Sequence, residues 1–270
     1  MINFFNHHNE FILPLAADRK PCGESYTYYM KKWGCNFSIP FSAFHRYYRE
    51  DSKNMNKFCT PIKEHYKEFN NKVGELLPAF ISWDSTSGTF EKINPKKNDE
   101  KYESPEFFGD NWDDDMENID KDVIEEYFTK FHQIKKKFGF LSFKIGKSEF
   151  NIKFSNKKEG IQFHTPRNSL IYSIKNNIFD DLLIGNYMKV KLINVPSLYP
   201  NFTPYVTKYG DNGLASTKSE LEKYFEYYRF NSSNFWIDFL KIKTEQVIRD
   251  KIQNYKSIYY FARKVKRNLN

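Results

Sequence analysis

Three short stretches of alternating apolar and polar residues in the middle of the chain restrict its fold most strongly. After Gly139 the sequence runs FLSFKIG, SEFNIKFS and GIQFHT, with charged residues between the stretches. Successive side chains of a strand point to opposite faces, so this alternation is typical of strands with one buried face. The three stretches therefore predict three adjacent strands that form a meander.

Apolar residues recur at helical spacing on both sides of these strands. Tyr26, Tyr29, Met30 and Trp33 mark an amphipathic helix, and Gly34 follows where a helix cap belongs. Further helices are expected from Thr60-Pro61 to about Leu77, at about 120–137, at 167–184 and at about 233–266. Another helix is expected to begin at the capping box formed by Thr217 and Glu220. Its inward-facing residues are Leu221, Tyr224, Phe225 and Tyr228. Further short strands are expected at 9–16, 35–40, 79–83 and 187–195. The predicted fold class is α+β, with mixed short-stranded sheets and flanking helices.

A long polar connection at 84–118 separates the two kinds of pattern. It is rich in Asp, Lys, Asn and Ser, and loops of this length are either functional or mobile. We therefore place a boundary near 118–139. The first part is 1–118, with its long acidic loop, and the second is 119–270, with the meander and two C-terminal helices.

Composition indicates a soluble, cytoplasmic protein. Aromatic residues make up 19% of the chain, enough to build a core, and no apolar run approaches the roughly 18 residues that span a bilayer. The N-terminus lacks the basic and apolar regions of a signal peptide. Cys22, Cys35 and Cys59 are odd in number and lack C-x-x-C spacing, which favours reduced thiols over disulfides or a zinc site.

Positive charge is concentrated at the C-terminus. The formal net charge is +8, and the last thirty residues hold nine Lys and Arg against Glu245 and Asp250, a net +7. Tyr255, Tyr259 and Phe261 are interleaved with these cations. The pattern suits nucleic acid or another anionic surface. One terminal helix without an RNA- or DNA-binding motif nevertheless favours the alternative, a helix that docks its aromatic face and leaves its basic face in solvent.

No complete catalytic or metal-binding motif is present in the sequence. The six histidines lack H-x-H-x-D-H and H-E-x-x-H spacing, and we expect His65 and His132 on solvent-facing helix surfaces. His45 follows the stretch FSIPFS, at the end of a predicted strand, where ligands of α/β sites often lie. It is therefore a candidate ligand, with an ordinary loop histidine as the alternative.

Two groups of carboxylates are further candidates. Asp110, Asp113, Asp114, Asp115 and Glu117 can supply oxygen ligands to a hard cation, or form a solvated loop before a helix N-terminus. Asp180 and Asp181 come at the end of a predicted helix, where the helix dipole does not favour negative charge. They are expected either to form local hydrogen bonds or to have a specific role.

Five stretches, taken together, resemble part of a known family. In order and spacing they are similar to the region after the metal strands in metallo-β-lactamase-fold proteins, and most similar to the subgroup related to CMP-N-acetylneuraminate hydroxylase. The stretches are IPFSAFHRYYREDS (39–52), LLPAFISWDSTSGTFEKINP (76–95), GDNW (109–112), IFDDLLIGNYMKVKL (178–192) and LYPNFTPYVTKYGDNG (198–213). The resemblance implies that 1–118 is the C-terminal portion of a metallo-β-lactamase-like domain.

The departures from the family define the functional hypothesis. The H-x-H-x-D-H motif and the Rieske domain, which precede this region in the family, are absent from the sequence. The resemblance implies a divalent metal whose main ligands are absent here, with His45 as the last ligand. It implies that the chain is the C-terminal piece of a split, truncated or two-chain enzyme, and an N-terminal partner chain would then carry the metal motif. The chain would then be the C-terminal module of a hydrolase or hydroxylase-like enzyme acting on a nucleotide-sugar or other anionic metabolite, and inactive alone. The alternative is a non-enzymatic module that binds nucleic acid or an acidic protein through its basic C-terminal helix.

Overall fold

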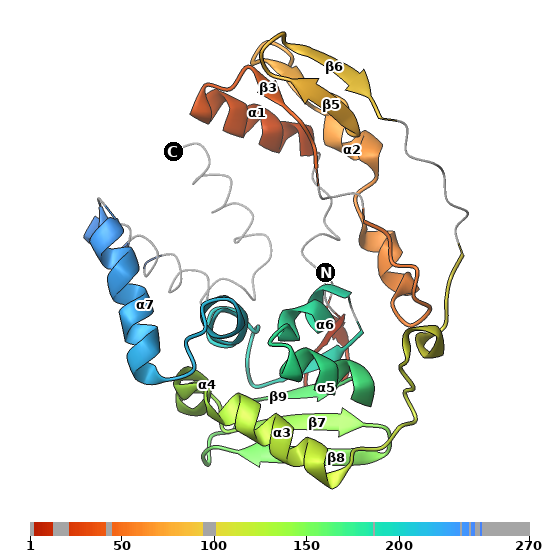
Figure 1. The fold of residues 1–270 in the computed structure, drawn as a ribbon, viewed down its shortest axis with the longest axis vertical. Helices are drawn as coiled ribbons and strands as arrows, with labels where there is room; N and C mark the ends of the chain where they lie inside the picture. Colours follow the sequence, from red (N-terminus) through yellow and green to blue (C-terminus); the bar gives the residue numbers. More distant parts are fainter. Residues whose placement is uncertain are drawn as a thin grey trace.

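The largest sheet of the described chain has six strands, is mixed, and lies in the lower part of the view in Figure 1. The computed structural model describes residues 3–12, 22–41, 45–93, 101–185, 187–232, 234–237, 239–240 and 244. The strands lie in the order β2 (Phe11–Ile12), β1 (Asn3–Phe5), β10 (Lys189–Ile193), β9 (Gly160–His164), β7 (Phe140–Ile145) and β8 (Ser148–Lys153). Two further two-stranded sheets lie outside this sheet. The fold class is α+β, as predicted.

The strands after Gly139 form, but they do not form a meander. β7 (Phe140–Ile145) and β8 (Ser148–Lys153) make an antiparallel hairpin, whereas β9 (Gly160–His164) lies on the other side of β7 and runs parallel to it. The connection 154–159 crosses the start of β7 and passes so close that a Cβ at Gly139 would meet the backbone of Lys157. The meander prediction was wrong because alternation indicates which residues are strands and says nothing of their order.

Residues from the beginning of the chain complete the sheet. β10 (Lys189–Ile193) pairs antiparallel with β9 and parallel with β1 (Asn3–Phe5), which in turn pairs with β2 (Phe11–Ile12). The sheet thus draws strands from both sides of the boundary proposed at 118. The division into two parts stays a prediction.

Helices cover one face of this sheet and enclose an aromatic core. They are α3 (Asn118–Thr129), α4 (His132–Lys137), α5 (Arg167–Lys175), α6 (Phe179–Gly185) and the π-helical segment η4 (Pro204–Asp211). Figure 1 shows α3, α5 and α6 side by side on the same side of the strands. The rings of Phe128, Phe143, Phe163, Phe179 and Phe202 meet in this core, each fully buried. Burying one such side chain contributes about 2–3 kcal/mol, and edge-to-face ring pairs add to that.

Two of the predicted helices are each split in two. The pattern at 120–137 gives α3 and α4, because Phe131 is extended between them. The pattern at 167–184 gives α5 and α6, because Asn177 has a left-handed backbone with φ of 53°. Asn tolerates that conformation better than most residues, so the break falls where the chain can accept it.

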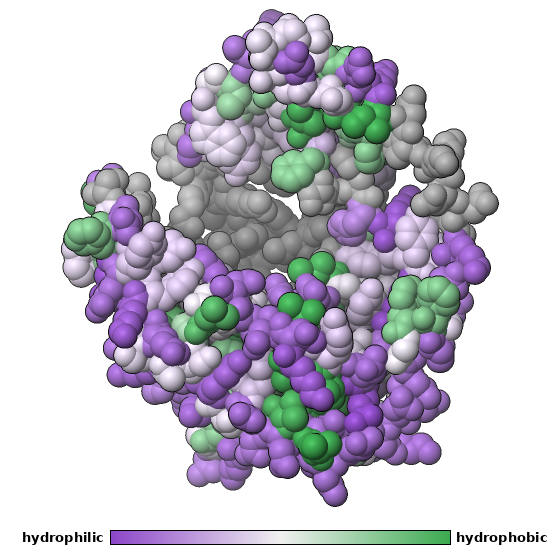
Figure 2. All heavy atoms as spheres, in the orientation of Figure 1, coloured by the Kyte–Doolittle hydropathy of each residue, from purple (hydrophilic) through white to green (hydrophobic). Residues whose placement is uncertain are grey.

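The segment 22–93 forms a separate group of small elements. It contains α1 (Cys22–Trp33), which ends at Gly34 with φ of +66° as expected, and the short parallel pair β3 (Phe37–Ser38) and β4 (Glu75–Leu76). The remaining elements of this segment and of the following connection are η2 (Lys53–Phe58), α2 (Ile62–Tyr66), β5 (Ile81–Asp84), β6 (Thr89–Lys92) and η3 (Pro105–Phe108). The connection predicted from 84 therefore contains the second strand of a hairpin. In Figure 2 the upper part of the molecule is mostly hydrophilic, with a small group of apolar residues along its lower edge.

The helix predicted from Thr60-Pro61 to about Leu77 stops at Tyr66. Lys67 is extended and Glu68 has a φ of 61°, which ends the helix. The turn at 67–69 packs directly on α1, where a Cβ at Gly23 would meet the backbone of Lys67 and Phe69. The packing of this turn against α1 therefore ends the helix earlier than the sequence pattern predicts.

Helix α7 (Lys218–Asn231) begins at the predicted capping box. The Glu220 backbone N–H donates to Thr217 Oγ1 over 3.2 Å. No residue of α7 is fully buried: Leu221, Tyr224 and Phe225 are half-buried, and Tyr228 is exposed, so its inward placement was wrong. The helix predicted at 233–266 falls largely outside the described residues. Within the described ranges, no helix combines the length and apolar composition that a membrane crossing requires.

Candidate functional site

A buried ion-pair network around Arg49 is the most elaborate polar arrangement in the described chain. The Arg49 side chain is only 4% exposed. Its Nη1 lies 2.6 Å from Asp110 Oδ2, and its Nε and Nη2 donate to the two oxygens of Asp51 over 3.0 and 2.9 Å. The planar guanidinium thus makes a bidentate contact with the Asp51 carboxylate and a single contact with the Asp110 carboxylate.

Aromatic rings enclose this network. The Arg49 guanidinium carbon lies 4.1 Å from the ring centroid of Tyr187 and 5.8 Å from that of Phe108. Trp112 donates from Nε1 to Asp51 Oδ2 over 2.9 Å. A cation over aromatic faces is attracted by the ring quadrupole, and the attraction strengthens where water is excluded.

Asp110 joins the network to α5. Its carboxylate accepts hydrogen bonds from Ser169 N over 2.9 Å and from Ser169 Oγ over 2.5 Å, and its side chain is 1% exposed. The expectation of a solvated acidic loop was therefore wrong for Asp110, because Arg49 and Ser169 together satisfy its charge in the interior.

The other acidic residues of that run are exposed, and two of them bond to distant parts of the chain: Asp115 to the β7–β8 turn and Glu117 to Arg167. Asp115 accepts hydrogen bonds from the backbone N–H groups of Lys147 and Ser148, which holds its pKa below the usual range and fixes the β7–β8 turn. Asp113 and Asp114 are exposed, and Glu117 is the N-cap of α3.

Segments far apart in the sequence meet at the Arg49 network. Arg49 comes from the stretch 39–52, Asp110 and Trp112 come from 109–112, and Tyr187 comes from 178–192. A second contact, from Tyr47 Oη to the Ile184 carbonyl over 3.3 Å, joins the first and last of these stretches again. Three of the five stretches that carry the family resemblance are thus held together by one set of contacts.

His45 lies at the exposed edge of this arrangement. Its ring is 5.2 Å from that of Tyr47 in an edge-on contact, and partial burial lowers its pKa. In the ranges that the structure describes, no three His, Cys, Asp or Glu side chains come together in a way that could hold a metal ion. His45 therefore has no set of co-ligands there, and the described residues by themselves do not fit the metal that the resemblance implies.

Asp180 and Asp181 lie in the first turn of α6, not at the end of a helix as predicted. The break at Asn177 places them there, and the helix dipole favours negative charge at that end. Asp181 is exposed, whereas Asp180 is half-buried, and burial, followed by the charge of Asp181, raises the pKa of Asp180.

A second buried polar pair, Tyr127 and Asp211, was missed by the sequence analysis. Tyr127 Oη lies 2.7 Å from both carboxylate oxygens of Asp211, and Phe179 N donates to the same carboxylate over 3.2 Å. Burial raises the pKa of both side chains. The pair ties α3 to η4 and to the start of α6, and Asp180 is near enough to affect the pKa values of both groups electrostatically.

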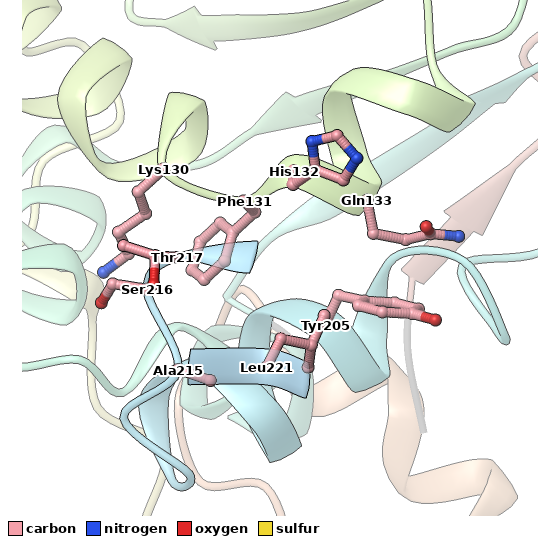
Figure 3. Close-up of a pocket in the computed structure, with 9 residues that line it drawn as sticks. All are labelled: Lys130, Phe131, His132, Gln133, Tyr205, Ala215, Ser216, Thr217 and Leu221. Carbon is pink, nitrogen blue, oxygen red and sulfur yellow. The ribbon is translucent and has the colours of Figure 1, made fainter. Parts of the chain in front are cut away.

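The hollow near this pair is too small for a substrate. Figure 3 shows it between the start of α4 and the segment leading into α7. Its lining includes Phe131, His132, Tyr205 and Leu221, and its volume is about 10 Å³, room for about one water molecule.

The remaining candidates are placed as follows. His65 was expected in solvent but is 2% exposed, because α2 packs against α1 and brings His65 Nδ1 within 2.9 Å of Tyr26 Oη. His132 is exposed, as predicted. Cys22, Cys35 and Cys59 are free thiols, and the basic C-terminal segment lies outside the described residues.

Comparisons of the chain with protein-family models, with curated proteins and with solved structures give no match.

Proposed function

We propose that this chain is the C-terminal module of a metal-dependent enzyme of the metallo-β-lactamase type. The enzyme would be hydrolase- or hydroxylase-like and would act on a nucleotide-sugar or another anionic metabolite, with a second polypeptide supplying most metal ligands. The observation that supports this proposal is the convergence at Arg49, where contacts join the stretches 39–52, 109–112 and 178–192.

In the proposed enzyme, the Arg49 network positions the segment that carries His45. Asp51 and Asp110 fix Arg49, and the Tyr47 hydroxyl fixes the chain two residues after His45 to α6. A histidine held in this way can offer one nitrogen to a metal. A stable site needs several correctly placed ligands, so the remaining ones must come from the partner polypeptide.

The test compares the chain alone with the chain bound to a polypeptide that carries H-x-H-x-D-H. Zinc, iron and manganese are measured by mass spectrometry after dialysis. We expect the complex to retain stoichiometric metal and the chain alone to lose it. His45→Ala should lower the metal content of the complex, whereas His132→Ala, an exposed histidine on α4, should leave it unchanged.

Two results would contradict the proposal. Stoichiometric, tightly held metal in the chain alone would show that it is not an incomplete module. Full metal retention in a complex that contains His45→Ala would remove His45 from the site.

A further inference from the structure

The face of the six-stranded sheet that lies opposite the helices has a distinct composition. Leu141, Phe143, Ile161, Phe163 and Val190 point into the core beneath the helices. Their neighbours along each strand point the other way, because side chains of a strand alternate between faces. We call this second surface the open face.

Strand register places lysines in the middle of the open face. Lys189 pairs with His164, which pairs with Lys144, and Lys191 lies two residues further along β10. Lysines two strands apart are about 10 Å apart, and lysines two residues apart on one strand are about 7 Å apart. Lys144 and Lys189 are exposed, and among the described residues neither they nor Lys191 takes part in an ion pair.

One strand carboxylate shares the open face with these lysines and lies directly opposite Lys144 across the β7–β8 pair. The strand carboxylate on the open face is that of Glu149, and it accepts hydrogen bonds from Ser142 Oγ over 2.9 Å and Gln162 Nε2 over 3.2 Å. His164 is neutral at pH 7, because burial and then the charges of Lys189 and Lys144 lower its pKa to about 4. The lysines therefore give the open face a net positive charge.

Aromatic rings lie beside the cations on the same face. The Trp112 ring stands edge-on to His164 at 5.0 Å, and Lys189 Nζ lies 5.3 Å from its centroid. At the other end, Phe140 lies over Gly160, where an added Cβ would meet the ring. Phe140 also lines an open, shallow hollow together with Asn151, Lys153, Ser155, Asn156 and Lys157.

We propose that the open face binds single-stranded nucleic acid, with phosphates on the lysines and unpaired bases against Trp112 and Phe140. Exposed lysines are complementary to a phosphate backbone, and aromatic side chains stack on bases that are not already paired. A shallow, open surface suits a polymer better than a small metabolite, which binds in a concave pocket. The proposal uses neither His45 nor the basic C-terminal segment.

The test measures binding of the full chain to a fluorescein-labelled thymidine oligonucleotide of about 15 nucleotides by fluorescence anisotropy at several salt concentrations. The triple variant K144Q/K189Q/K191Q is compared with K135Q/K136Q/K137Q, which removes the same charge from exposed positions on α4. We expect the open-face variant to bind at least about tenfold more weakly and to lower the logarithmic salt slope by about two, while the α4 variant stays near the unmodified chain.

A gain-of-binding variant keeps the test decisive if the triple variant does not fold. Asn151→Lys adds a cation at an exposed position of β8 on the open face and should tighten binding. A duplex of the same length should bind more weakly than the single strand. An equal loss of affinity in both triple variants would mean that binding depends on overall charge or on another part of the chain, and it would overturn the proposal. Equal affinity for the duplex and the single strand would also overturn it. So would the absence of binding at low salt.

Discussion

Arg49 illustrates how one buried cation depends on its immediate partners. A guanidinium with 4% exposure has lost nearly all its hydration, and Asp51 and Asp110 replace that hydration. Asp110 is even less exposed, so each charge is stable only while the other is present. Removing one partner leaves an uncompensated charge in the interior, which costs far more than losing a surface ion pair.

Arg49→Met is therefore expected to lower the free energy of unfolding by about 3 kcal/mol. The matched control is Lys218→Met, which removes a cation from the exposed Lys218–Glu222 pair and should cost less than about 0.5 kcal/mol. Urea unfolding followed by circular dichroism gives both values. A loss below about 1 kcal/mol for Arg49→Met would mean that the network does not stabilise the fold as described.

The residues of the network could be recognised only in part from the sequence. Trp112 and Asp110 stand in the stretch GDNW, which carried the family resemblance, but nothing local indicates that Asp110 is buried. Its partner Ser169 is 59 residues away, and Tyr127 and Asp211 are 84 residues apart. Such pairings depend on tertiary contacts, which no local periodicity encodes.

At the scale of elements, the sequence predicted most helices and strands correctly but not how they connect. The strands 140–145, 148–153 and 160–164 and the α7 capping box were found because alternation and capping are local signals. The helix breaks at Phe131 and Asn177 and the crossing of β7 were missed. The crossing is fixed by packing between segments, which local patterns do not encode, whereas the left-handed backbone of Asn177 is one conformation that Asn accepts without requiring it.

The crossing over β7 gives a prediction about Gly139. An added methyl group would meet the Lys157 backbone, which cannot rotate away as a side chain can, so Gly139→Ala should destabilise the protein by about 3 kcal/mol. Gly88→Ala is the control: it lies in open space with φ of +69° and should cost only about 1 kcal/mol of backbone strain. Thermal unfolding distinguishes the two, and equal losses would contradict a tight crossing.

For the whole molecule, burial is concentrated around one sheet. The strands β7, β9 and β10 each bury one face in the core, whereas every residue of β6 is exposed and α7 contains no fully buried residue. Local opening is easiest where few apolar contacts must be broken. The stability of the molecule should therefore differ strongly between its parts.

Hydrogen–deuterium exchange followed by mass spectrometry measures this difference. Amide protons of β7, β9 and β10 are expected to exchange slowest, and those of α7 and of the β5–β6 hairpin fastest. Protection of α7 equal to that of β9 would indicate that α7 is covered by contacts that the described residues do not provide.

The pairing of β1 with β10 has a consequence for how the chain is made. Asn3 is synthesised well before its partner Lys189, which lies 186 residues later in the chain (189 − 3 = 186). At about 5–20 residues per second, β1 waits on the order of 10–40 s before it can pair. The β7–β8 hairpin and β9 have closer partners and can assemble while β1 is still unpaired. Closure of the sheet is thus a late event in biosynthesis, because it joins an early-made strand to a core that already exists.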